Sequence, residues 1–91
     1  MERSLETNEA REQADFNDAY ELEQQLESAE RRYAEARGAS IKAREEWRAI
    51  STQPGASPGS IRAAKIRFDA VAARCSRLHD LIEKLERRLD D

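Results

Sequence analysis

The residues best suited to chemistry lie close together in the second half of the chain. Cys75, His79 and Glu83 follow one another at intervals of four, so a helix would place them on adjacent turns of one face. A thiolate, an imidazole and a carboxylate are all metal ligands, but a structural zinc site needs a fourth donor. The chain has one cysteine and one histidine, and position 76 is serine, so the Glu-x-x-His spacing of diiron bundles is absent. We expect no metal site and no cofactor.

Catalysis is equally unexpected. Cys75 falls in a periodic apolar series, where a thiol acts as a small buried hydrophobe and is unreactive. An enzyme also needs polar groups that converge in a shielded cleft, and the elements described next do not form one. We therefore expect a protein that is not an enzyme and has no catalytic residues.

Two periodic apolar seams divide the chain. One runs from Leu22 to Ile50 and the other from Ile61 to Leu89, each with alternating intervals of three and four residues. This is the heptad pattern of coiled-coil helices. The first seam comprises Leu22, Leu26, Ala29, Tyr33, Ala36, Ser40, Ala43, Trp47 and Ile50, and the second comprises Ile61, Ala64, Phe68, Val71, Cys75, Leu78, Ile82, Leu85 and Leu89.

One segment interrupts the helical pattern. Four of the five Gly and Pro residues lie within residues 54–59, and such a cluster ends a helix. Ser60 is a candidate N-cap for the second helix, and Ser57 followed by Pro58 is an alternative start. The first and last residues of each seam are 28 positions apart, so a turn near Ala56 brings the two seams into register.

The sequence thus predicts an all-α fold, an antiparallel two-helix coiled-coil hairpin that assembles into a four-helix bundle. We expect an acidic N-terminal overhang over residues 1–21, either helical or disordered, a first helix over 22–52, a turn over 53–59 and a second helix over 60–91. We interpret Trp47 and Tyr33 as core residues opposite Ala64 and Val71; the alternative is that they widen a groove for a partner helix.

Self-association or a partner is expected because two helices bury only one stripe each, which leaves a scaffold of this size near the limit of stability. Small and apolar residues outside the seams are candidates for the contact, and so are two aromatic residues of the overhang. The candidate protein-interface residues are Phe16, Tyr20, Ile41, Ala63, Ile66, Ala70 and Ala73. The chain is therefore predicted to be an interaction module that forms a homo-oligomer, with a dimer favoured, or docks a partner helix.

Charge is distributed unevenly along the chain. Residues 1–30 hold ten acidic and two basic side chains, whereas 31–52 and 60–77 are basic. The basic turn end could bind nucleic acid, and its candidate residues are Arg44, Arg48, Arg62, Lys65 and Arg67. Oppositely charged ends also favour assembly of two hairpins. Alternatively, the charges serve solubility and pair within helices, as Glu27–Arg31 and Asp80–Lys84 would.

The composition of the chain and its helix–turn–helix arrangement suggest where the protein acts and what it resembles. No leader-like or membrane-spanning segment is apparent, so we expect a cytoplasmic protein. Thirteen Arg against three Lys, in an alanine-rich chain, hint at a GC-rich bacterial genome. In size, acidity and helix–Pro/Gly turn–helix plan the chain resembles small bacterial hairpin proteins, among them the co-chaperones of type III secretion needle subunits. The resemblance covers architecture and implies a co-chaperone-like adaptor or assembly factor.

Overall fold

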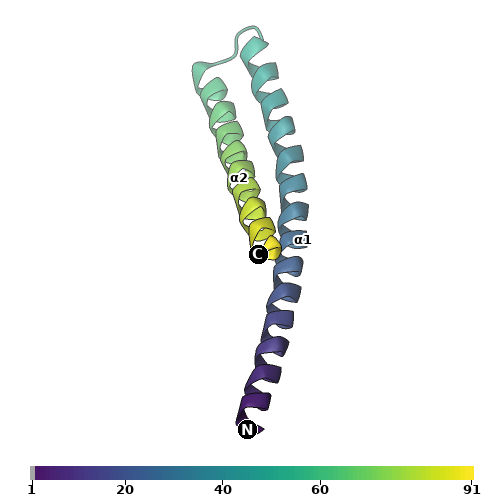
Figure 1. Ribbon diagram of the computed structural model, residues 1–91. Coiled ribbons are helices and arrows are strands. Elements are labelled where there is room, and N and C mark those ends of the chain that lie inside the picture. The colour runs from purple at the N-terminus through teal and green to yellow at the C-terminus, as the bar shows by residue number, and fades with distance from the viewer. Residues whose placement is uncertain (1) are drawn as a thin grey trace.

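The computed structural model consists of two α-helices joined by a short turn (Figure 1). Helix α1 spans Glu2–Thr52 and helix α2 spans Pro58–Asp90. The structure describes the backbone of residues 2–91 and the side chains of residues 18–91. Helix α2 returns alongside α1, so the chain is an all-α helical hairpin. In the described residues, neither helix carries the run of apolar residues that a bilayer crossing requires.

The turn follows from its proline and glycine residues. Gly55 has a φ of 79°, a left-handed conformation that glycine adopts without steric cost. The second helix begins at the alternative start: Ser57 is the N-cap, and its Oγ accepts a hydrogen bond of 3.1 Å from the backbone N–H of Ser60. Pro58 suits the first helical position because its fixed φ is helical and its missing N–H would have had no partner there.

The two predicted seams form the contact between the helices. All eighteen seam positions are buried or half-buried, whereas the other side chains of residues 18–91 are exposed except Ser28, Ala56 and Ala72. Four seam residues are fully buried, namely Ala29, Ala36, Ala64 and Leu85. The predicted core positions are therefore confirmed, although Cys75, which was expected to be buried, is only half-buried.

Aromatic side chains pack across the seam against partners that differ from the predicted ones. The Trp47 ring stacks on Phe68 with 5.8 Å between centroids, one turn beyond the expected neighbour Ala64. The alanine methyl leaves room for the indole to reach Phe68. Tyr33 lies beside His79, at 6.1 Å between ring centroids. Val71 was the expected partner, but it lies eight residues from His79, about 12 Å along α2.

Candidate interaction surfaces

The largest apolar side chain exposed near the turn end of α2 belongs to a stripe of otherwise small residues. Ile66 is 60% exposed, and Ala63, Ala70 and Ala73 are exposed with it. Intervals of three and four place all four on one side of the helix. We call these residues the α2 stripe. The four interface candidates that lie on α2 thus share one solvent-facing side of that helix.

The candidates from α1 lie on the other helix and form a second surface. Ile41 is 54% exposed and Tyr20 is 58% exposed, and Ala34 is exposed between them. Phe16 lies outside the residues whose side chains the structure describes. Since the α1 and α2 residues both point away from the seam that joins the helices, the hairpin presents two separate outer surfaces.

Leu81 is an exposed apolar residue that the sequence analysis missed. It is 41% exposed and lines a shallow, open groove between the helices together with Leu85 of α2 and Gln25, Ala29 and Arg32 of α1. A signal for it existed in the sequence, because Leu81 lies three residues after seam residue Leu78 and four before Leu85. That spacing places an apolar side chain on the flank of the seam.

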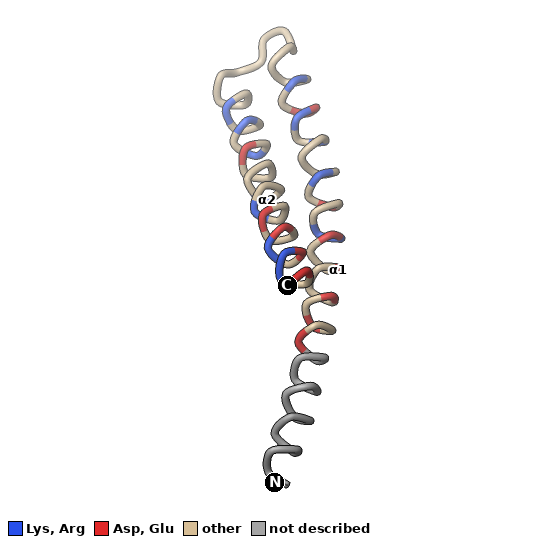
Figure 2. The backbone as a smooth tube through the Cα atoms, in the orientation of Figure 1, with Lys and Arg blue, Asp and Glu red and all other residues tan. Residues whose placement is uncertain are grey.

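Charge divides the hairpin into two halves (Figure 2). The turn half, residues 31–52 and 60–77, holds eleven Lys and Arg against four acidic residues, a net charge of +7. The open half, residues 18–30 and 78–91, holds ten acidic residues against three basic ones, a net charge of −7. Because the helices fold back on each other, segments of like charge lie side by side.

The charged side chains of residues 18–91 make almost no ion pairs with one another. The one pair within 4.0 Å joins His79 to Glu83, so the expected pairs Glu27–Arg31 and Asp80–Lys84 are not formed. Segregation of like charges explains why cross-helix pairs are scarce. All five basic-end candidates, Arg44, Arg48, Arg62, Lys65 and Arg67, are exposed, and the Nζ atom of Lys65 lies 6.0 Å from the Trp47 ring centroid.

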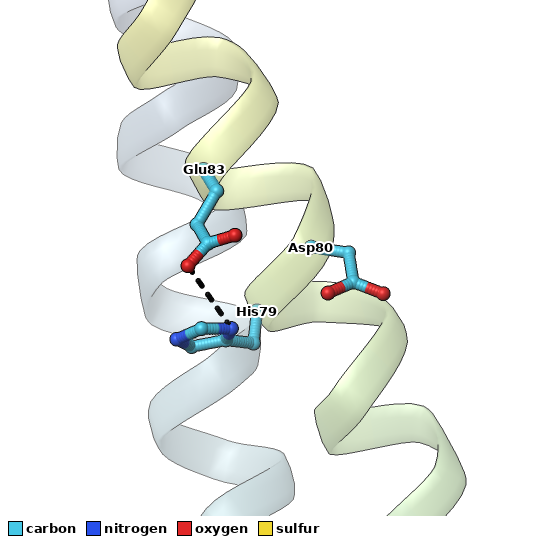
Figure 3. A group of neighbouring side chains, drawn as sticks. All are labelled: His79, Asp80 and Glu83. Carbon is cyan, nitrogen blue, oxygen red and sulfur yellow. Dashed lines mark ion pairs between the residues drawn. The ribbon is translucent and has the colours of Figure 1, made fainter.

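The residues singled out for chemistry are only partly brought together (Figure 3). His79, Asp80 and Glu83 place ligand atoms within 4.8 Å of one another, and all three are exposed. The His79 Nδ1 atom lies 3.8 Å from the Glu83 Oε1 atom, with both side chains 55% exposed. Cys75 is not part of this group. Three water-exposed donors on one helix fall short of a four-ligand zinc shell and lack the outer hydrogen bonds that orient ligands.

Comparison with known proteins adds no relative. The chain matches no protein-family model, no curated protein and no solved structure.

Proposed function

We propose that the chain is a non-enzymatic protein–protein interaction module, a small antiparallel coiled-coil hairpin that self-associates and docks a partner helix. In this proposal two hairpins combine into a four-helix bundle, and the protein serves as an adaptor or assembly factor of the co-chaperone kind. The observation that carries it is the exposure of Ile41 and Ile66, at 54% and 60%, on the outer side of each helix.

Burial of these surfaces would supply stability that the hairpin lacks. Of the side chains in residues 18–91, the four that are fully buried are three alanines and one leucine, so little apolar area leaves water on folding. Burying the exposed part of one such isoleucine contributes roughly 1–2 kcal/mol, a sizeable share of the net stability of a small domain. Binding through the outer surfaces therefore stabilises the fold as well as the complex.

The proposal predicts assembly at micromolar concentration and its loss in the double variant Ile41→Glu/Ile66→Glu. The double variant removes both isoleucines from both chains of the assembly, which weakens association at least about tenfold, and a carboxylate in the contact adds to this. Sedimentation equilibrium on both proteins gives the measurement. The matched control is Gln25→Glu/Ala39→Glu, which adds the same charge at two exposed positions of α1 that lie about 160° around the helix from Ile41, and it should assemble like the wild type. A wild type that is monomeric and binds no helical partner contradicts the proposal.

The basic turn half supports one alternative, an accessory protein that binds nucleic acid. Its eleven Lys and Arg have no carboxylate within 4.0 Å in the described part of the chain, so they are available to phosphates. If this alternative holds, affinity for duplex DNA should fall steeply with salt, with a slope of log K against log salt of about −0.9 per phosphate contact. Arg62→Glu should reduce both the affinity and the slope. Binding that is undetectable at about 50 mM salt argues for the interaction module.

A further inference from the structure

Gly38 is the residue that the hairpin itself does not explain. Glycine is the least favourable residue in a helix interior after proline, yet Gly38 lies deep inside α1. A Cβ atom added there would meet nothing within 4 Å, so packing inside the chain does not require its absence. What glycine does provide is close approach by the backbone of another helix.

Two further residues place Gly38 at the centre of an apolar patch. Ala34 lies four residues before it and Ile41 three residues after it, so all three lie on one side of α1. All are exposed, and Ile41 is the largest of them, with 54% of its surface in water. A partner helix that crossed at Gly38 would cover all three.

The charged residues that continue this spacing identify the partner. The same intervals of four and three extend the patch to Glu27 and Arg31 on one side and to Glu45 and Arg48 on the other. We call the seven residues the α1 outer face; it comprises Glu27, Arg31, Ala34, Gly38, Ile41, Glu45 and Arg48, all exposed. None of its charged groups has an ion-pair partner within 4.0 Å among residues 18–91.

The α1 outer face is complementary to itself when one copy is turned end for end. A two-fold axis at Gly38 leaves three residues of the α1 outer face on either side. In the dimer, each residue then lies opposite the residue that is equally many places from Gly38 on the other side of the face in the second copy. The pairs are Gly38 with Gly38, Ala34 with Ile41, Arg31 with Glu45 and Glu27 with Arg48. We propose that this face binds a second copy of the chain, antiparallel, with the two Gly38 backbones in contact. This inference rests on the proposed function and assigns its self-association to α1, which leaves the α2 stripe for a partner helix.

The charged residues of the α1 outer face agree with this orientation and oppose the parallel one. An antiparallel copy with its axis at Gly38 sets each arginine of the face opposite a glutamate of the other copy. Parallel copies would set like halves together and would bring Glu27 against Glu27 and Arg31 against Arg31. Like charges placed opposite each other across an interface disfavour that arrangement.

Charge reversal at Arg31 and Glu45 tests the pairing directly. In the antiparallel dimer, Arg31→Glu alone puts two carboxylates opposite each other at both ends, and Glu45→Arg alone does the same with two guanidinium groups. Each variant should dimerise at least about tenfold more weakly than the wild type. An equimolar mixture of the two restores both opposite-charge pairs, so a heterodimer should form within about threefold of the wild-type affinity. Sedimentation equilibrium gives these constants.

A matched control lies one residue further along the helix. Arg32→Glu and Glu46→Arg have the same spacing and the same charge changes, but both lie about 100° around α1 from the tested pair. They should dimerise like the wild type, alone and mixed. If the wild type dimerises and the Arg31 and Glu45 variants behave like this control, the α1 outer face is not the contact, although the interaction module stands. A strictly monomeric wild type overturns both.

Gly38→Leu supplies a second test, because it should raise the stability of the single hairpin and weaken the dimer. A leucine at this position has free space around it in the single hairpin and a higher helix propensity than glycine, so the monomer should melt at a higher temperature. The same side chain separates the two backbones at the axis, and the dimer should weaken at least about tenfold. A dimer that tolerates leucine at position 38 overturns the close crossing at this residue.

Discussion

Replacing Leu85 with alanine should lower the free energy of unfolding by about 2–5 kcal/mol, the usual cost of a large-to-small change in a core. Leu85 is 3% exposed, and it is the one large side chain among the four fully buried residues of the described part of the chain. A scaffold of two helices has few other apolar contacts to compensate. Since the whole stability of a small domain is of similar size, the variant should be mostly unfolded at 25 °C.

Leu81→Ala is the matched control for this change. The same atoms are removed one turn away on the same helix, but Leu81 is 41% exposed, so the expected loss is roughly 1 kcal/mol or less. Urea unfolding followed by circular dichroism gives both values, at one protein concentration because assembly contributes to apparent stability. Equal losses for the two variants would mean that Leu85 is no more buried in solution than Leu81.

The heptad seam was predictable because its physical cause is local. A helix turns about 100° per residue, so residues at intervals of three and four share a face regardless of the rest of the fold. The turn was predictable for the same reason, since Pro and Gly act on their own backbone. The choice between Ser57 and Ser60 as N-cap was left open by the sequence, because both serines suit that position. The structure selects Ser57, which places Pro58 at the first helical position.

Pairings across the seam were less predictable. Counting residues outward from the turn predicts which positions of α1 and α2 lie opposite each other. It does not predict how far a large side chain extends along the partner helix. Trp47 meets Ala64 by counting, yet its ring extends one turn to stack on Phe68. Tyr33 lies beside His79, which agrees with the counting because the same register places Tyr33 opposite Leu78; the expected partner Val71 did not follow from that register. Aromatic rings move toward the available space and toward other rings, and that space is a property of both helices together.

The surfaces were predictable in part. Ile41 and Ile66 were recognised because they are large apolar residues away from the seam, and both are exposed. Leu81 was missed because its spacing from Leu78 and Leu85 resembles that of a core residue. Gly38 was missed because a glycine in a helix is notable only when its surroundings are known, and the empty space around it is visible in the structure alone.

The predicted ion pairs failed for a reason that bears on function. Glu27 and Arg31 have the spacing of a stabilising helix pair, but such surface pairs contribute only about 0.2–0.5 kcal/mol. Water competes with so small a gain, and the structure does not form the pair. The same two side chains can gain more in a contact with another molecule, where water is excluded and each group meets an opposite charge.

The second large effect is expected at Ala64, where aspartate should abolish folding. Ala64 is 1% exposed and lies on the seam beside the Trp47–Phe68 stack. A carboxylate there has no hydrogen-bond donor in the apolar contact, and burying an unpaired charge costs several kcal/mol. The larger side chain also forces the helices apart. Circular dichroism should show loss of helix at 25 °C.

Ala63→Asp separates the fold from the proposed binding surface. Ala63 is the neighbouring residue, but it is exposed and belongs to the α2 stripe. A carboxylate at position 63 stays in water in the single hairpin, because this position is exposed, so it carries no burial cost there. Helix content and melting temperature should therefore match the wild type, whereas docking of a partner helix on the α2 stripe should be lost. If Ala64→Asp folds as well as Ala63→Asp, position 64 does not lie in the contact between α1 and α2.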